Sequence, residues 1–389
     1  MRDSGVSSAT AMHWKHFGIE GRVYQAPGRV NLIGEHTDTS EGYVMPAALD
    51  LRTHSVLSPR ADTIARIYSA NFDQQVSVNL RQLPPAGRGH WSDYPVSVLW
   101  SLQRREIHCR GFDMTVAGNV PIGSGLSSSA SIEVAVAIAV LDHAQATLTK
   151  PEIAKICQIA ENRFVGAQSG IMDPLASCCG VKDHAILLDC RSLEYEPLPL
   201  PGEVALVICN SMVKHSLSDT GGYNQRRAEV QEGVRILQKN YPEMRTLRDL
   251  DEQELRVSST EMPDPIFRRC WHVVTENRRV MQAAAALREG DFVRFGELMV
   301  QAHSSMRDNY EASCAEIDLL VDLAMRQTGC FGARITGGGF GGCTVNLVAS
   351  KNATAFVENV RSEYRHKTGI EAEIHLLYAS DGAGPMQRA

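Results

Sequence analysis

Charged side chains gather in one short segment near the N-terminus of the chain. Residues 26–38 read APGRVNLIGEHTD, and the titratable members of this segment are Arg29, Glu35, His36 and Asp38. A solvated loop normally lacks an apolar stretch such as VNLI, so we expect these polar groups to converge beside buried backbone. A carboxylate, an imidazole and a second carboxylate within four residues can hydrogen-bond the hydroxyls of a polyol. A surface turn is the alternative that this segment alone leaves open.

A second segment has the composition of a phosphate-binding loop. Residues 121–131 read PIGSGLSSSAS and lie between an expected strand, 112–117, and an expected apolar helix, about 127–146. Glycines let the backbone approach a ligand, and the N-terminus of the following helix offers free N–H groups to an anion. A turn with serine N-caps is the plainer interpretation. A Walker A nucleotide site is excluded, because Gly is never followed by Lys in the chain.

Two further carboxylates lie close together in the sequence. An expected helix begins at Pro151, carries Glu161 at the edge of its apolar face and ends near Gly166. The next residues, GAQSGIMDP (166–174), place Asp173 among apolar neighbours. Glu161 could point into a cleft, and Asp173 could be a partly buried carboxylate that needs a cation. A solvent-facing glutamate and an Asx-turn aspartate are the ordinary alternatives.

A glycine cluster occupies residues 336–343, TGGGFGGC, and contains the pattern G-x-G-x-x-G. It precedes the β-branched strand TVNLV and opens no helix, and no βαβ unit with a ribose-binding acid follows. We therefore reject a dinucleotide site. Five glycines in six residues favour a close approach of this backbone to another backbone or to a ligand.

The elements that must position these segments alternate between strand-like and helix-like patterns in both halves of the chain. Further expected strands are 185–190, 204–210 and 371–378. Helical patterns cover 267–289, 291–306, 315–327 and 352–367, and residues 249–264 are expected to form a surface connection. The pattern predicts a mixed α and β protein with a domain boundary near residue 200.

The composition limits the class of protein. A length of 389 residues favours two domains, and 43% hydrophobic with 22% charged residues is ordinary globular usage. A net charge of -6 argues against nucleic acid and anionic membranes as partners. Among the ten cysteines no C-x-x-C pair occurs, and the sequence has no apolar run of membrane-spanning or signal-peptide length. We expect a cytoplasmic protein without a zinc or disulfide framework.

Together and in this order, the four segments resemble the galactokinases of the GHMP kinase superfamily. GRVNLIGEHTD is similar to the galactokinase signature, PIGSGLSSSAS to the GHMP phosphate loop, SGIMD to the catalytic loop and TGGGFGGC to the third GHMP motif. Similarity continues in LLDCRSLE (187–194), GYNQRRAEV (222–230) and SMRDNYE (305–311), so the resemblance covers most of the chain.

The resemblance implies an α+β, two-domain GHMP kinase fold with the active site in the cleft between the domains. The N-terminal domain, 1–203, would hold a mixed sheet with helices, and the C-terminal domain, 204–389, would be ferredoxin-like. The implied reaction transfers the γ-phosphoryl group of ATP to the anomeric hydroxyl of α-D-galactose and gives galactose 1-phosphate and ADP. ATP and Mg²⁺ would be required, galactose would be the small-molecule partner, and we expect a monomer while leaving an oligomer open.

The resemblance also implies a role for individual residues. Asp173 would be the catalytic carboxylate and Arg29 the charged neighbour that stabilises the transferring phosphoryl group. Ser129 and Glu161 would hold magnesium. The implied sugar contacts are Glu35, His36, Thr37, Asp38, Gly170 and Tyr223. The implied nucleotide contacts are Ser69, Trp91, Tyr94 and the loop residues Gly123, Ser124, Gly125, Leu126, Ser127, Ser128 and Ser129.

Two positions depart from the common galactokinase pattern. Thr39 and Ser40 follow GEHTD where Tyr is usual, and Pro174 follows GIMD where Gln is usual. Neither position carries an assigned chemical role, but the breadth of accepted sugars stays open. A kinase for N-acetylgalactosamine or arabinose is one alternative, and a catalytically silent sugar and ATP sensor is another. The phosphate loop together with Asp173 and Arg29 favours the kinase over the sensor.

Overall fold

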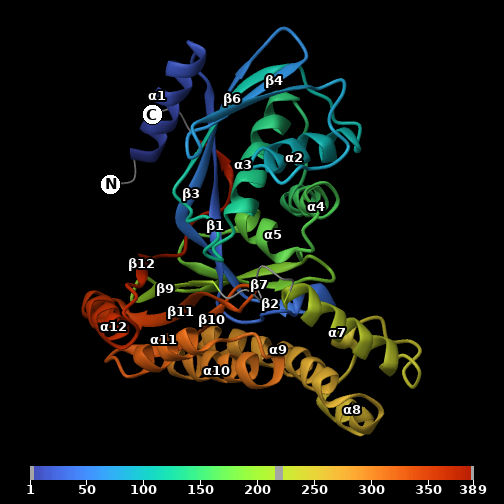
Figure 1. The fold of residues 1–389 in the computed structure, drawn as a ribbon, viewed down its shortest axis with the longest axis vertical. Coiled ribbons are helices and arrows are strands. Elements are labelled where there is room, and N and C mark those ends of the chain that lie inside the picture. The colour runs from blue at the N-terminus through green and yellow to red at the C-terminus, as the bar shows by residue number, and fades with distance from the viewer. Residues whose placement is uncertain (1–3, 215–221, 387–389) are drawn as a thin grey trace.

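The computed structural model describes residues 4–214 and 222–386 of the chain. Figure 1 shows two halves of mixed helix and sheet, with the N-terminal elements above and most of the C-terminal elements below. The division predicted near residue 200 falls between the last N-terminal strand, β8 (Tyr195–Pro199), and the first C-terminal strand, β9 (Val204–Lys214). The predicted α+β class agrees with this arrangement.

The N-terminal half is built on a six-stranded sheet with the order β13-β1-β3-β6-β4-β5. Its strands are β1 (Arg22–Asn31), β3 (Pro46–Pro59), β4 (Ile64–Ser69), β5 (Gln74–Asn79), β6 (Phe112–Gly118) and β13 (Gly384–Pro385). The pair β4–β6 is parallel and the other pairs are antiparallel, so the sheet is mixed, as predicted. Because β13 pairs with β1, residues 384–385 lie in the N-terminal sheet although the expected domain 204–389 included them.

Helices cover this sheet on both sides. They are α1 (Ser4–Phe17), α2 (Asp93–Gln103), α3 (Ser128–His143), α4 (Lys150–Ala160) and α5 (Met172–Cys179). Figure 1 shows α1 on one side of the strands and α2 to α5 on the other. Apolar side chains of α3, among them Val134 and Val140, join those of the strands, among them Ile67 and Met114, in one buried cluster. This packing fixes the start of α3, where the phosphate-loop candidate ends.

The end of α4 differs from the expected continuous helix. Thr149 and Glu152 form a capping box at its start, but the α-helix stops at Ala160 and a π-helical turn, η2 (Glu161–Val165), follows. Gly166 ends the turn with φ 92°, a value that suits glycine. A π turn adds one residue to the helix, and an apolar face with a period near 3.6 does not reveal a single added residue. Glu161 is the first residue of this turn.

The C-terminal half contains a four-stranded antiparallel sheet with the order β10-β11-β9-β12. Besides β9, its strands are β10 (Cys330–Thr336), β11 (Gly341–Ala349) and β12 (Glu373–Leu377). Between the two large sheets lies a small one, β2-β7-β8, which adds β2 (Tyr43–Val44) and β7 (His184–Asp189). The strands expected at 185–190, 204–210 and 371–378 are confirmed to within a few residues.

Long helices cover the lower sheet, as Figure 1 shows. The C-terminal helices are α7 (Gly222–Leu237), α8 (Glu252–Val257), α9 (Asp264–Glu289), α10 (Phe292–Ser305), α11 (Ala315–Met325) and α12 (Ala353–Thr368). The short helical turns are η1 (Asp38–Ser40), η3 (Leu247–Asp249), η4 (Ser258–Glu261), η5 (Met306–Tyr310) and η6 (Ser350–Asn352). The expected surface connection 249–264 contains α8, because Asp251 and Glu254 form a capping box at its start.

One hydrophobic cluster crosses from the first half to the second. Leu32 and Ile33, which follow β1, pack in the same buried cluster as Ile208 of β9 and Leu298 of α10. The two halves are therefore held together by a shared core, which positions groups from both halves at the cleft. Within residues 4–214 and 222–386, none of the helices has the length and apolar composition needed to cross a bilayer.

Candidate active site

Arg29 and Asp173 form a forked ion pair at one end of a cavity of about 810 Å³. Arg29 Nε donates to Asp173 Oδ1 at 2.7 Å, and Nη2 donates to Oδ2 at 2.6 Å. Nη1 donates to the carbonyl oxygen of Gly125 at 2.6 Å. The Ser127 hydroxyl also donates to Asp173 Oδ2. A planar guanidinium bound at three acceptors has little freedom, so the orientation of the carboxylate is fixed.

The phosphate-loop candidate turns tightly between β6 and α3. Gly123 and Gly125 have φ values of 72° and 82°, and Ser127 adopts the same left-handed region with φ 58°. The loop rests on β1, because the Arg29 amide donates to the Leu126 carbonyl at 3.1 Å and a Cβ on Gly28 would lie 2.6 Å from that oxygen. Ser127, Ser128 and Ser129 at the start of α3 line the cavity, and Ser127 contacts Asp173, so the free N–H groups of this first turn lie near the cavity.

The predicted loop contacts divide into two groups. Five line the cavity, namely Gly123, Gly125, Ser127, Ser128 and Ser129. The other two turn away from it: the Ser124 hydroxyl donates to the Pro121 carbonyl at 2.9 Å, and the Leu126 side chain is buried in the core. Ser124 and Leu126 can therefore contact a ligand only through their backbone.

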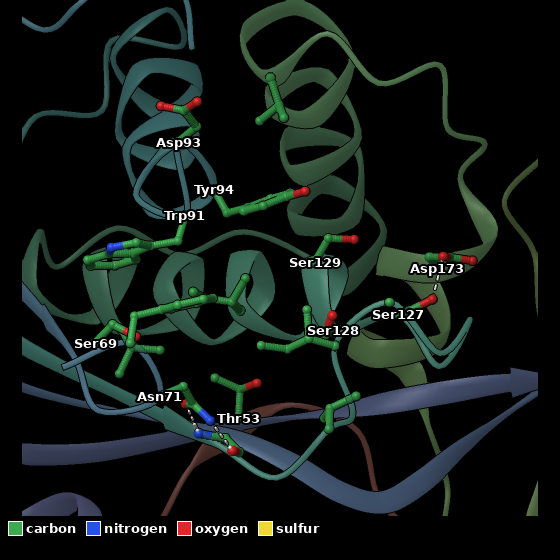
Figure 2. A pocket seen from close by; sticks show the side chains of 18 of the residues that line it. Thr53, Ser69, Asn71, Trp91, Asp93, Tyr94, Ser127, Ser128, Ser129 and Asp173 are labelled. Atoms are coloured by element: carbon green, nitrogen blue, oxygen red, sulfur yellow. Dashed lines mark hydrogen bonds between the residues drawn. The ribbon is translucent and has the colours of Figure 1, made fainter. Parts of the chain in front are cut away.

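Aromatic side chains line the end of the cavity away from Asp173. Figure 2 shows Trp91 and Tyr94 across the cavity from Ser69, with Asp173 at the opposite end. The Trp91 indole N–H donates to Gln74 Oε1 at 2.8 Å, which holds the ring in place. Trp91, Tyr94 and Ser69, the predicted nucleotide contacts, thus line the same cavity as the phosphate-loop candidate.

Sequence reasoning missed other residues at this end. Phe72 lies in the turn between β4 and β5, lines the cavity and stacks on Trp91 with ring centroids 6.0 Å apart and an interplanar angle of 13°. Ile122, which is 63% exposed, also lines it. Asn71 exchanges two hydrogen bonds with the backbone of Gly118, at 2.8 and 2.9 Å, and so anchors the turn. An aromatic residue at a polar hairpin turn was the signal available for Phe72.

Glu161 is the first residue of the π turn after α4 and does not itself line the cavity, but its carboxylate interacts with Ser129, which does. Its carboxylate accepts the Ser169 hydroxyl at 2.6 Å. Burial raises the pKa of Glu161, while hydrogen bonds from the Ser169 and Ser129 hydroxyls oppose that shift. Glu133 of α3 is also buried nearby, and its pKa is raised well above the ordinary value by burial and by the Glu161 charge. Carboxylates crowded in this way favour a nearby cation.

The oxygen donors at this point suit magnesium. Ser129 and Glu161 supply a hydroxyl and a carboxylate beside the loop, and Mg²⁺ commonly takes one or two protein oxygens together with phosphate oxygens. In the part of the chain that the structure describes, no cluster of three or more His, Cys, Asp or Glu side chains could hold a metal by itself. The donor set therefore fits a metal that arrives with a nucleotide.

Asp38, a predicted sugar contact, lies close to Asp173. Burial, followed by the charge of Asp173, raises the pKa of Asp38 to about 6. Its Oδ1 accepts the Thr39 amide at 2.8 Å. Gly170 packs directly on the carboxylate, since a Cβ at that position would lie 1.6 Å from Asp38 Oδ2. The structure thus brings together Asp38 and Gly170, which the sequence separates by more than a hundred residues.

His36 adopts a left-handed backbone with φ 62° and lies among aromatic rings. It stacks on Tyr310 with centroids 4.3 Å apart, and Tyr223 lies 5.5 Å away. Burial lowers the pKa of His36 to about 3, so the ring is neutral at physiological pH. Its Nε2 has no hydrogen-bond partner among the described residues. A buried ring nitrogen without a partner is suited to a ligand hydroxyl.

Two of the predicted sugar contacts are engaged with the protein. The Glu35 carboxylate accepts a hydrogen bond from Asn31 Nδ2 at 3.0 Å and another from the Gly337 backbone N–H at 2.9 Å. Arg334 Nη2 lies 3.4 Å from Glu35 Oε1. The Thr37 hydroxyl lies 2.9 and 2.7 Å from the carbonyl oxygens of Gly34 and Tyr43. In this structure Glu35 and Thr37 hold the turn that presents His36 and Asp38. Tyr310 belongs to SMRDNYE (305–311), a segment similar to galactokinases to which the sequence analysis gave no role. Its ring lies nearer to His36 than the ring of Tyr223 does.

The third glycine motif makes the close approaches expected of it. A Cβ on Gly339 would lie 2.4 Å from the Ala312 carbonyl oxygen, and a Cβ on Gly337 would lie 3.6 Å from the Gly125 Cα. The Cys343 sulfur lies 2.8 Å from the Ser124 carbonyl oxygen. The motif therefore joins the C-terminal sheet to the phosphate-loop candidate.

The chain matches three family models. They are the GHMP kinases N terminal domain at residues 93–181, the galactokinase galactose-binding signature at 11–59 and the GHMP kinases C terminal model at 283–366. A galactokinase from Roseiflexus sp. (strain RS-1) is 44% identical over 371 residues, which cover 95% of this chain and 94% of that one. The chain belongs to the galactokinase family. The family predicted from the motifs is confirmed.

Solved structures agree with this membership. The crystal structure of Lactococcus lactis galactokinase complexed with galactose superposes with a TM-score of 0.93 at 32% identity, covering 98% of this chain and all of that one. A galactokinase from Fusobacterium nucleatum is 41% identical over 96% of this chain and 97% of its own length. A mevalonate kinase structure, with a TM-score of 0.65 and 17% identity, shares the fold. The two-domain GHMP kinase fold and the ATP-dependent sugar kinase activity predicted from the sequence are confirmed.

Proposed function

We propose that this member of the galactokinase family transfers the γ-phosphoryl group of ATP to the anomeric hydroxyl of α-D-galactose, giving galactose 1-phosphate and ADP. The observation that carries the proposal is the position of the Arg29–Asp173 pair. It lies between a phosphate-loop cavity on one side and the Asp38 and His36 side chains on the other. The galactose bound by the Lactococcus lactis relative supports the choice of sugar.

Asp173 would receive the proton of the attacking hydroxyl and orient that hydroxyl toward the γ-phosphorus. Arg29 holds the carboxylate of Asp173 in one orientation with two hydrogen bonds. A loose phosphoryl-transfer transition state needs little early removal of the proton. Orientation and charge neutralisation by Arg29 would therefore contribute more than the basicity of Asp173.

The phosphates would be bound by the N–H groups and hydroxyls of the loop at residues 123–129, with the adenine near Trp91, Tyr94 and Phe72. Ser129 and Glu161 would hold Mg²⁺. The metal, when bound, would neutralise charge on the β- and γ-phosphate oxygens. The buried carboxylate, the adjacent hydroxyl and the neighbouring Glu133 support this placement.

The sugar would be bound by three side chains, Asp38, His36 and Tyr223, and by the backbone at Gly170. The neutral His36 ring offers one unpartnered nitrogen, and Asp38 offers acceptors. Glu35 and Thr37 would act indirectly, by fixing the turn that carries these groups. Tyr310 would form the wall behind His36.

The proposed domains are 1–203 and 204–389, with β13 of the second segment added to the sheet of the first. We also propose a cytoplasmic location. All ten cysteines are free thiols, a state that a reducing compartment maintains. A monomer is the proposed oligomeric state, and sedimentation velocity on the purified chain tests it.

An ADP-release assay over a panel of sugars tests the proposed reaction. We expect galactose to give the highest kcat/KM among galactose, glucose, arabinose and N-acetylgalactosamine. A higher value for N-acetylgalactosamine or arabinose would assign another sugar to the same kinase. Binding of galactose and ATP without ADP release would assign the silent sensor instead.

A further inference from the structure

Ser169 lies in the loop between α4 and α5, and its amide, carbonyl and hydroxyl all contact residues of the π turn η2. Its amide donates to Asn162 Oδ1 at 2.9 Å, and its carbonyl accepts from Asn162 Nδ2 at 3.0 Å. Its hydroxyl oxygen lies 2.6 Å from Glu161 Oε2 and 3.0 Å from Asn162 Oδ1. The amide of one asparagine thus fixes the backbone of Ser169, and the carboxylate beside it contacts the hydroxyl.

The single proton of the Ser169 hydroxyl is directed to Glu161. Asn162 Oδ1 already accepts the Ser169 amide, and a carboxylate is the stronger and nearer acceptor. The Gly166 and Ala167 amides both donate to the Glu161 carbonyl oxygen, at 2.9 and 3.2 Å, which closes the loop onto the π turn. The backbone and the side chain of Glu161 are therefore both tied to residues 166–169.

The other end of the same loop lies against the sugar side. Gly170 directly follows Ser169, and a Cβ on Gly170 would lie 1.6 Å from Asp38 Oδ2. Gly170 packs so closely on Asp38 that no side chain fits between them, and a shift of the loop away from Asp38 would stretch the hydrogen bonds at Ser169. One residue therefore connects a candidate metal ligand, Glu161, to a candidate sugar ligand, Asp38.

We propose that Ser169 is a positioning residue that couples metal binding to galactose binding. Its hydroxyl holds Oε2 of Glu161 and so sets the direction of the carboxylate, while its backbone holds Gly170 against Asp38. The inference rests on the proposed roles of Glu161 and Asp38. Because coupling is reciprocal, Mg²⁺ with nucleotide strengthens galactose binding by the same factor by which galactose strengthens binding of the metal-nucleotide complex.

Equilibrium binding to the intact enzyme tests the coupling without turnover. Electron paramagnetic resonance measures the binding of Mn²⁺ in the presence of a non-hydrolysable ATP analogue. Calorimetry measures the binding of galactose with and without the complex of Mg²⁺ and this analogue. We expect Ser169→Ala to weaken Mn²⁺ binding about tenfold, as removal of a group that orients a metal ligand commonly does. It should also reduce the enhancement of galactose binding by Mg²⁺ and analogue toward one.

Ser101→Ala is the matched control, because Ser101 is a buried serine whose hydroxyl donates to the Ile156 carbonyl of the same helix α4 at 3.0 Å. It should leave both affinities unchanged. In a Glu161→Ala background, Ser169→Ala should cause no further loss of Mn²⁺ affinity. An equal loss in both backgrounds, or wild-type coupling in Ser169→Ala, would overturn the inference.

The proposed function fails in a different way. If Glu161→Ala itself leaves Mn²⁺ affinity unchanged, the metal assignment is wrong. If Glu161→Ala weakens Mn²⁺ binding and Ser169→Ala binds Mn²⁺ as the wild type does, the metal assignment stands and the role of Ser169 is wrong.

Discussion

At the proposed nucleotide end of the cleft the chain offers backbone N–H groups, hydroxyls and half-exposed aromatic rings, mostly from the N-terminal half. At the proposed sugar end it offers buried side chains from both halves. Phe72 and Ile122 are 47% and 63% exposed, but His36 is 8% exposed. A phosphate chain is bound through charge and many small donors, so its site tolerates an open surface. An enzyme distinguishes a sugar from its epimers by individual hydroxyls. This discrimination requires polar groups that are buried and fixed before binding.

The two ends nevertheless share one structural feature. Helix α4 ends in the π turn Glu161–Val165, and helix α10 ends in the π turn Met306–Tyr310. Each turn is followed by a residue in the left-handed region, Gly166 or Glu311. The first turn begins at Glu161, the proposed metal ligand, and the second ends at Tyr310, which stacks on His36. An added residue in a helix re-aims a side chain that the regular helix would direct elsewhere.

The largest expected effect comes from the pair between the two ends. Asp173→Asn should retain binding of ATP and galactose but lower kcat by about 10²–10⁴, the usual loss when a catalytic carboxylate is removed. Single-turnover kinetics and calorimetry measure the two properties. Asp113→Asn is the control. Asp113 lies on β6, and its carboxylate oxygens also accept two hydrogen bonds from one arginine, Arg66, each at 2.6 Å. A kcat near the wild-type value in Asp173→Asn would show that Arg29 and the loop at 123–129 suffice for catalysis without the carboxylate.

A methyl group at Gly170 should damage the sugar end selectively. Gly170→Ala places a Cβ against Asp38, and relief of that overlap should raise the galactose KM about tenfold or more with little change in the KM for ATP. Gly202→Ala is the control, since nothing lies within 4 Å of a Cβ there. Equal changes in the KM values for galactose and ATP would mean that the loop containing Gly170 affects the binding of both substrates.

Epimer discrimination should depend on Asp38. Leaving a buried acceptor unpaired costs about 1–3 kcal/mol, so glucose should show a kcat/KM about ten- to a hundredfold below that of galactose. Asp38→Ala should lower galactose kcat/KM far more than it alters ATP binding. Steady-state kinetics with both sugars provide the comparison. Equal kcat/KM values would indicate that Thr39 and its neighbours have widened the pocket.

The two ends should also differ in their pH dependence. Burial and the charge of Asp173 raise the pKa of Asp38 to about 6, so the Asp38 carboxylate becomes protonated and loses its negative charge as the pH falls through that value. Galactose kcat/KM should therefore decline below about pH 6, while equilibrium binding of ATP changes less. His36 stays neutral over this range, since its pKa is lowered to about 3. Asp38→Asn should remove the decline, and an unchanged profile in that variant would assign it to another group.

The raised pKa of Asp38 has a consequence for stability as well. The folded state binds this proton more tightly than the unfolded state, so the contribution of Asp38 to stability falls as the pH rises from about 4 to 6. Asp38→Asn should therefore have a higher Tm than the wild type at pH 7, and the difference should shrink at pH 5.

The smallest effect is expected at the open nucleotide end. Phe72→Ala removes one ring of the stack on Trp91, an interaction worth about 0.5–1.5 kcal/mol, so the KM for ATP should rise about two- to tenfold. The galactose KM should not change. Trp14→Ala, which alters an exposed aromatic residue on α1, is the control. A rise in the galactose KM in Phe72→Ala would contradict the separation of the two ends.

Residue patterns predicted β6, α3, β7, β9 and β12 to within a few residues, but they gave no bounds for β1, which carries Arg29, or for α5, which carries Asp173. Glycine placement predicted the close approach of the third glycine motif, whereas the resemblance to galactokinases implied the contacts of the loop at 123–129 and the Arg29–Asp173 pair. The sequence did not reveal that Ser124 and Leu126 turn away from the cavity, or that Glu35 is bound to the Gly337 amide. A motif identifies which residues belong together, but the direction of each side chain depends on neighbours from other parts of the chain.

By itself the sequence determined the family, the alternation of strands and helices and the residue types at the cleft, because periodicity and glycine placement are local properties. Only the tertiary structure decided which groups face the ligands. The stack of Tyr310 on His36, the contact of Gly170 with Asp38 and the bond from Ser169 to Glu161 arise where separate elements meet. The raised pKa of Asp38 is decided in the same way, because burial and a neighbouring charge exist only after the chain has folded.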